Sequence, residues 1–448
     1  MDETPTEQTA KWNPAQLFGL RFAVIYFLAY FFPTPFTLPL DACRLTTASS
    51  WISSHVDAFW LRLDSFVGPH ILQTGPIAYK PSGSSDSLYH WVTLFSIFML
   101  ALIGSLVWTA FDRKRAHYEG TYEFLRIVLR YSLAIILMGY GFNKVGQFPP
   151  LTGHDLFTRF GDETPTGILW NFMGSSFGYS IFSGVLEAGA GILLLFRRTT
   201  TLGSLLAVAV MLNVFLLNVF YDVSIKTAAF HYLVSGLVLS LPDLKRLLNV
   251  LVLNTPTFPR TMEHPIVSRK VRVTALSVKW ILVGLLVCGN IADSVDLYKA
   301  IHNPMIGAWD VTSFKQNGAE VDPNAPNTGR WKTITFTPYV PQLDRFLFQL
   351  PKDRMFQFKY KDDGRTLAPE ALAGTGNFTF DQHGDNLTIY GTLPGGPIVV
   401  ELVRDKQLEL ANHHTHWIQE DWRPRDTPER PLPPAYMHNG VMMVETSN

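Results

Sequence analysis

A carboxylate lies in the middle of a long apolar segment of this chain. Glu187 falls within residues 178–196, a run rich in Gly, Ala, Leu and Phe that is long enough to cross a lipid bilayer. An unpaired charge at that depth costs at least about 2.5 kcal/mol. We therefore expect Glu187 to have a cationic partner, a bound proton or a catalytic task.

Two basic side chains are candidates for that partner. Lys144 lies near the end of the apolar segment 125–147, and His231 lies in the apolar segment 226–241. If these segments are membrane helices, both side chains lie in the outer half of the bilayer, with Glu187 beneath them. We predict that Glu187, His231 and Lys144 form a catalytic set of acid and base beside a cavity open to the outer face.

Further polar side chains in these segments are predicted to bind a ligand. Tyr140 and Lys144 are one helical turn apart, and Arg130 lies about four turns earlier on the same face. The predicted ligand-binding residues are Arg130, Tyr140, Asn143, Asn213, Asn218 and Asp222. The alternative is that such residues only hydrogen-bond between helices, for less than about 1–2 kcal/mol each. No metal site is predicted.

The composition indicates a membrane part followed by a polar part. Hydrophobic residues make up 47% of the chain and charged residues 17%, and the strong apolar runs all precede residue 300. The expected fold class is an α-helical membrane bundle of about seven transmembrane helices, followed by a C-terminal antiparallel β domain. The predicted spans are roughly 16–36, 91–111, 125–147, 178–196, 201–220, 226–241 and 278–296.

The basic residues between the spans predict an orientation. With seven spans, the clusters at 112–115, 197–198, 245–246 and 269–272 fall on one side, which the positive-inside rule makes cytoplasmic. The first residues lack a basic n-region, so we expect an uncleaved, cytoplasmic N-terminus. The expected location is a bacterial inner (plasma) membrane, with the long loop 37–90 capping the bundle outside.

From residue 305 onward the apolar residues recur with a period of two. Strands are predicted at 308–314, 331–337, 345–350, 355–360, 377–380, 387–390 and 398–403, with turns at 316–318, 362–364 and 383–386. This pattern predicts an antiparallel meander outside the membrane that closes into a barrel-like domain.

The two ends of this region are similar to those of lipocalin-like domains. Gly307-Ala-Trp309 resembles the opening Gly-x-Trp motif, and Arg423 and Arg425, after the segment 416–420, resemble the closing basic residue. Such a barrel is filled by its own side chains or holds an apolar ligand.

The stretch 125–254 resembles the DoxX-like four-helix membrane core. The residues that carry the resemblance are Gly139–Val145, the segment 182–201 with Glu187 followed by small residues, and the segment 217–226 before the helix that bears His231. The resemblance implies a compact four-helix bundle, related by name to a subunit of a thiosulfate:quinone oxidoreductase and found in other membrane redox complexes.

Four domains follow from these patterns. Residues 1–124 are expected to form two N-terminal transmembrane helices with a long outer loop, and 125–254 the DoxX-like core. Residues 255–304 would form a cytoplasmic loop and the last transmembrane helix, and 305–448 the extracytoplasmic β domain.

Three functions remain open. The first is a quinone-linked redox complex subunit, a membrane oxidoreductase component with quinone as its cofactor and other membrane or extracytoplasmic redox subunits as partners. The second is a binding or transport protein for a small anion or a lipid headgroup. The third is a structural or assembly subunit with an extracytoplasmic docking domain. The bilayer is a partner in each, whereas a formal net charge of zero gives no reason to expect nucleic-acid binding.

The predicted orientation can be tested by labelling in intact cells. A cysteine introduced at Gly318 should react with a membrane-impermeant thiol reagent, because the β domain is expected outside. A cysteine introduced at Thr200 should not react, because it follows a cytoplasmic basic cluster. The reversed pattern of labelling would refute the orientation.

Overall fold

The computed structural model separates the chain into two compact units. One unit comprises residues 1–149 and 159–303, and the other comprises residues 150–158 and 304–448. The structure describes residues 12–77, 84–113, 115, 117–151, 155, 160–258, 268–322, 330–331, 333–338, 345–350, 354–360, 366–369, 378–393, 395–405, 435–438 and 441–444.

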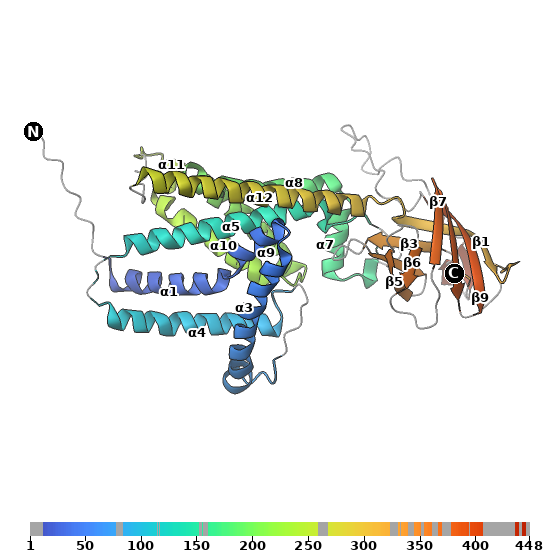
Figure 1. Cartoon of the computed structure of the whole chain (residues 1–448), viewed down its shortest axis with the longest axis horizontal. Coiled ribbons are helices and arrows are strands. Elements are labelled where there is room, and N and C mark those ends of the chain that lie inside the picture. The colour runs from blue at the N-terminus through green and yellow to red at the C-terminus, as the bar shows by residue number, and fades with distance from the viewer. Residues whose placement is uncertain are drawn as a thin grey trace, which may run out of the picture. The chain divides into compact units, whose positions relative to one another are not determined.

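The first unit is helical. Its helices are α1 (Pro14–Phe31), α2 (Thr34–Ala42), α3 (Thr46–Val67), α4 (Leu88–Phe111), α5 (Glu119–Gln147), α7 (Pro165–Gly174), α8 (Phe177–Leu195), α9 (Thr200–Phe220), α10 (Lys226–Ser240), α11 (Leu244–Leu251) and α12 (Arg269–Ile301). In Figure 1, α1, α4, α5 and α12 run in nearly the same direction, whereas α3 runs across them. The predicted outer loop 37–90 therefore contains regular helix.

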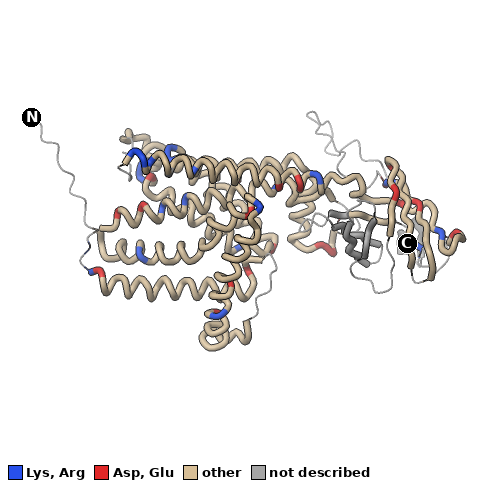
Figure 2. Tube along the Cα trace, viewed as in Figure 1, with Lys and Arg blue, Asp and Glu red and all other residues tan. Residues whose placement is uncertain are grey.

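Six helical segments among the described residues are long and apolar enough to cross a membrane, so the chain is a membrane protein. They are Pro14–Ala42, Leu88–Phe111, Glu119–Gln147, Phe177–Leu195, Arg197–Phe220 and Arg269–Ile301. Figure 2 shows that charged residues are sparse along these helices and that Lys and Arg gather at the start of α12. The seventh predicted span, 226–241, coincides with α10, which has only 15 residues. The count of seven therefore stays a prediction.

Helices α5 and α8 approach each other through glycine. A Cβ atom added at Gly141 would lie 2.5 Å from the carbonyl oxygen of Gly184, and one added at Gly184 would lie 2.5 Å from the carbonyl oxygen of Gly141. About two turns further along α8, a Cβ at Gly191 would lie 2.7 Å from the carbonyl oxygen of Ala134. Small residues let membrane helices pack backbone to backbone, which here replaces side-chain interdigitation.

The second unit is an antiparallel sheet, as the period of two predicts. Its strands are β1 (Gly307–Gln316), β2 (Ala319–Glu320), β3 (Thr333–Pro338), β4 (Arg345–Leu350), β5 (Arg354–Tyr360), β6 (Thr366–Pro369), β7 (Phe378–His383), β8 (Asn386–Leu393) and β9 (Gly396–Arg404). They pair in the order β2-β1-β3-β4-β5-β6-β7-β8-β9, and β1 also pairs with β9, which closes the sheet on itself. A separate hairpin joins β10 (Ala435–His438) to β11 (Val441–Val444).

The turns of this sheet follow their residue types. Asn317 and Gly318 between β1 and β2 have φ angles of 52° and 80°, and Gly384 between β7 and β8 has a φ of 62°. Asn and Gly tolerate this left-handed region, which tight hairpins require. The predicted turn at 362–364 lies outside the described residues.

The Gly-x-Trp motif forms part of the buried core of the sheet. Trp309 is fully buried, and its indole Nε1 donates to the carbonyl oxygen of Met305 at 2.9 Å. The guanidinium of Arg404, at the end of β9, lies 4.6 Å from the centre of the Trp309 ring. The basic residue that covers this tryptophan thus comes from β9. The predicted closing segment, 416–420 with Arg423 and Arg425, lies outside the described residues.

The α5–α8 contact predicts different outcomes for two substitutions within one helix. Gly184→Ala should lower the free energy of unfolding by about 1–3 kcal/mol, because the new Cβ would meet backbone. Gly189→Ala is the matched control. A Cβ there meets nothing within 4 Å, so this variant should be neutral or more stable by up to about 1 kcal/mol. Thermal unfolding in detergent gives both values, and equal melting temperatures for the two variants would contradict the packing.

Candidate functional site

Glu187 and Lys144 form a buried ion pair where α5 and α8 meet. The distance from Lys144 Nζ to Glu187 Oε1 is 3.4 Å, and the two side chains are 9% and 2% exposed. Lys144 Nζ also donates to Gln147 Oε1 at 3.0 Å and lies 5.1 Å from the centre of the Phe148 ring. Such a pair is tolerated among apolar helices because each charge offsets the other.

One oxygen of Glu187 is not satisfied by this pair. Glu187 Oε2 is buried and has no hydrogen-bond partner among the described residues. A buried acceptor without a donor is costly, so native proteins seldom leave one without a reason. The carboxylate therefore retains an acceptor for a further group.

The ion pair lies on the wall of a cavity of about 90 Å³. Five helices, namely α5, α7, α8, α9 and α10, contribute to this wall, which is largely apolar and aromatic. Its polar residues are Tyr140, Lys144, Gln147, Tyr179, Ser183, Glu187, Asn213, Asn218 and Tyr232. Tyr179 and Asn213 are exposed at the surface of the helical unit, so the cavity has its opening beside them.

The structure brings four further sequence-predicted residues to different places around this cavity. Tyr140, Asn213 and Asn218 line it together with Lys144 and Glu187. Asn218 Nδ2 donates to the carbonyl oxygen of Ile225 at 3.3 Å, which holds the turn before α10. Asn143, next to Lys144 in α5, is exposed and does not line the cavity.

His231 lies outside the cavity wall. Its Nδ1 lies 2.6 Å from the carbonyl oxygen of Thr227, and its Nε2 lies 2.7 Å from the hydroxyl of Tyr26 in α1. The ring also stacks on Tyr30 with a centroid distance of 4.0 Å. A carbonyl oxygen only accepts, so Nδ1 donates and Nε2 accepts from Tyr26. The expectation that His231 shares a site with Glu187 does not match this geometry, because Nδ1 is bonded within α10 and Nε2 joins α10 to α1.

Arg130 and Asp222 also lie away from the ion pair. Arg130 donates to the hydroxyl of Tyr131 at 2.9 Å, and it precedes Lys144 by about 21 Å of helix rise. The carboxylate of Asp222 is 80% exposed and pairs with Lys226 at 2.8 Å. By its spacing Arg130 shares a face of α5 with Lys144, but it lies too far along the helix axis to reach the ion pair.

Gln147 was missed by the sequence analysis although a signal was present. It follows Lys144 by three residues, a spacing at which helical side chains meet. Because its amide oxygen accepts from Lys144, Gln147 holds the ammonium group toward Glu187.

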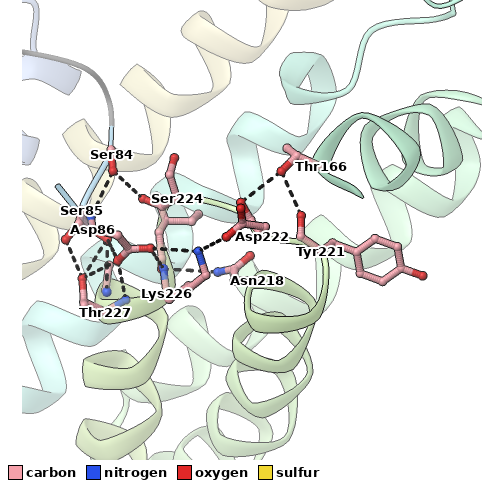
Figure 3. Close-up of polar contacts among 12 residues, drawn as sticks. Ser84, Ser85, Asp86, Thr166, Asn218, Tyr221, Asp222, Ser224, Lys226 and Thr227 are labelled. Carbon is pink, nitrogen blue, oxygen red and sulfur yellow. Dashed lines mark hydrogen bonds and ion pairs between the residues drawn. The ribbon is translucent and has the colours of Figure 1, made fainter. Parts of the chain in front are cut away.

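A second polar cluster, the Asp86 cap, was also missed. It joins residues 84–86, before α4, to the first turn of α10 (Figure 3). Asp86 accepts hydrogen bonds from the backbone N–H groups of Lys226 at 2.8 Å and Thr227 at 2.9 Å. Ser85 N–H and Ser84 Oγ both donate to the carbonyl oxygen of Ser224. Helix α10 has no cap from its own preceding residue, so Asp86 serves as its N-cap from 140 residues away.

The charge of Asp86 is stabilised in this position. Burial would raise the pKa of the Asp86 carboxyl, but hydrogen bonds from Thr227, Lys226 and Ser85 outweigh burial and lower that pKa below its ordinary value. On the other side of the turn, Thr166 Oγ1 lies 2.9 Å from the carbonyl oxygen of Tyr221. The turn 221–226, whose Ile225 lines the cavity, is thus held from two sides.

The fold and the site together define a helical membrane protein with a polar ion pair on the wall of an apolar cavity. No family model matches the chain, and no solved structure matches it. The uncharacterized protein YwoB of Bacillus subtilis (strain 168) is 30% identical over 127 residues, which are 27% of this chain and 78% of the relative. The chain belongs to the same family as YwoB.

The Asp86 cap predicts a dependence of stability on pH. The pKa of Asp86 is lower in the folded protein than in the unfolded chain, so its contribution is complete above the ordinary pKa of about 3.9 and is lost as the pH falls through the lower folded value. Asp86→Asn should lower the free energy of unfolding by about 1–2 kcal/mol at neutral pH, because the two carboxylate oxygens each accept a backbone N–H and the amide of Asn can accept with only one of its two atoms. It should also lessen the loss of stability in acid, as measured by thermal unfolding at a series of pH values.

Asp222→Asn is the matched control in the same cluster. Asp222 forms an exposed pair with Lys226, which contributes less than about 1 kcal/mol. If the two variants lost the same stability, the capping role of Asp86 would be disproved.

Proposed function

We propose that this protein binds the polar end of a small membrane-soluble molecule in the cavity of its helical unit. The observation that carries this proposal is the buried pair of Lys144 and Glu187 on a cavity wall, among helices apolar enough to cross a membrane. Ionisable groups at such depth are expensive and usually serve a function. A mostly apolar wall with a few polar groups is typical of ligand sites.

We propose further that residues 125–254 form a DoxX-like four-helix core made of α5, α8, α9 and α10, and that the molecule is a quinone of a membrane redox complex. The sequence resemblance supports the core, and all four helices contribute to the cavity wall. A quinone carbonyl oxygen would accept a hydrogen bond from Lys144. The relative YwoB is uncharacterized and adds no activity to this proposal.

The size of the cavity limits how such a molecule enters. A cavity of about 90 Å³ is smaller than the roughly 150 Å³ that accommodates a benzene ring in other proteins. Only one edge of a quinone ring would reach Lys144, and the rest of the ring would lie at the opening beside Tyr179 and Asn213.

The alternative functions differ in their support. Binding of a small anion has less support than binding of a quinone. Lys144 is the one Lys or Arg among the described lining residues, and Glu187 already pairs with it. A neutral part of a lipid headgroup fits the same polar groups as a quinone edge. A purely structural subunit would bind no ligand in the cavity.

We also propose seven crossings, with the N-terminus cytoplasmic and the β unit outside. Helix α10 rises about 22 Å, which is less than the roughly 30 Å of a bilayer core. Its start would then lie below the outer surface, where backbone groups need partners. The Asp86 cap supplies these partners to Lys226 and Thr227.

Quinone binding can be tested with the full-length protein in lipid nanodiscs. A short-chain quinone should quench part of the tryptophan fluorescence, because Trp170 lines the cavity, and Trp170→Phe should remove that part. Ser183→Leu should weaken binding by about tenfold or more, because the larger side chain occupies the cavity.

Val185→Leu is the control on the same helix. Val185 is 62% exposed, so this variant should bind like the wild type. Absence of quinone binding by the wild type would refute the quinone proposal, and wild-type affinity in Ser183→Leu would exclude this cavity as the site.

A further inference from the structure

The polar groups on the cavity wall differ in what they offer a ligand. Glu187 Oε2 is buried and has no donor among the described residues. A carboxylate only accepts hydrogen bonds, so a ligand must donate to this oxygen. Burial makes the need for a donor stronger, because no bulk water competes there.

Lys144 offers hydrogen-bond donors, whereas Glu187 offers an acceptor. An ammonium group has three N–H donors. One points to Glu187 Oε1 and another to Gln147 Oε1, at 3.4 and 3.0 Å. The third N–H is available to an acceptor on the ligand. Nζ also lies 5.1 Å from the centre of the Phe148 ring, which accepts no conventional hydrogen bond.

We propose that the site selects a hydroxyl-bearing headgroup, such as a phenol, a hydroquinone or an alcohol, over its carbonyl or ether counterpart. This inference rests on the proposed function, because it concerns the same cavity. It refines that proposal: of the two redox states of a quinone, the reduced state, which carries hydroxyls, would bind more tightly, and the oxidised state more weakly through Lys144 alone. A hydroxyl donates to Glu187 Oε2 and accepts from Lys144 at once. A carbonyl or an ether oxygen only accepts and leaves Glu187 Oε2 without a donor.

Other ligand classes match the wall less well. A primary ammonium group donates but cannot accept from Lys144. An anion accepts but meets the carboxylate of Glu187. The pair is neutral overall, so a neutral group that both donates and accepts is the best complement.

The dimensions agree with a hydroxyl at the tip of a larger molecule. The cavity of about 90 Å³ admits a hydroxyl and a few carbon atoms. Tyr179 and Asn213, both exposed, mark an opening through which the rest of the molecule extends. Asn213 lies seven residues before the end of α9 at Phe220, or about 10 Å of rise, so this opening faces the depth at which lipid chains lie.

A matched pair of probes tests the selectivity. 4-Propylphenol and 4-propylanisole differ only in the methyl group that replaces the hydroxyl hydrogen. Their dissociation constants are measured with the full-length protein in nanodiscs by tryptophan fluorescence, with empty nanodiscs used to correct for partition into lipid. We expect the phenol to bind about tenfold or more tightly than the anisole, since one hydrogen bond to a charged acceptor is lost.

The variant Glu187→Gln should remove or reverse this preference. Its side-chain amide can donate to the ether oxygen of the anisole, which the carboxylate cannot. If this variant fails to fold because Lys144 is left unpaired, the double variant Lys144→Met with Glu187→Gln removes both buried charges and should also lose the preference. Val185→Leu, on the exposed face of α8, should keep it.

The outcomes separate this inference from the proposed function. Equal affinity for both probes in the wild type, or a preference that survives Glu187→Gln, would overturn the hydroxyl selectivity while ligand binding in the cavity still stood. If neither probe binds but a short-chain quinone does, the selectivity is likewise overturned. If neither the probes nor the quinone bind, the proposed function fails together with it.

Discussion

The close approach of α5 and α8 is the constraint on which the rest of the helical unit depends. Gly141 and Gly184 allow the two backbones to touch, since either Cβ would lie 2.5 Å from the opposite carbonyl oxygen. Without this contact, Lys144 and Glu187, each three residues further along its helix, would not reach 3.4 Å. A helix pair held by backbone contact leaves little freedom for side chains to adapt, so the ion pair has a fixed geometry.

The same constraint explains why the cavity lies on one side of the pair. Glu187 is held against α5 by one oxygen, and its other oxygen has no partner among the described residues. Helix α9 continues the wall through Asn213 and Asn218, and α10 completes it through small residues such as Ala228 and Ala229. Tight packing on the α5 side and small side chains on the α10 side together leave a space beside a charged group.

The sequence predicted the apolar helices and the alternating strands because each depends on local periodicity, as the run around Glu187 and the strand at 398–403 illustrate. Lys144 was a candidate partner of Glu187 because a buried charge requires one. The position of His231 could not be predicted, since it depends on Tyr26, which is 205 residues away in the chain. Asn143 was chosen beside Lys144, yet neighbouring helical residues point about 100° apart, and only Lys144 lines the cavity. Gln147 had a readable signal, whereas nothing local indicated that Asp86 caps α10.

The Asp86 cap limits how this chain can be divided into modules. The aligned part is 78% of YwoB and 27% of this chain, so this chain contains much sequence beyond a shorter relative. Such extra helices are often regarded as additions to an independent core. Here, however, the start of α10 takes its cap from residues 84–86. A boundary at residue 125 would separate Asp86 from α10, so a fragment that began there would leave the start of α10 without this cap.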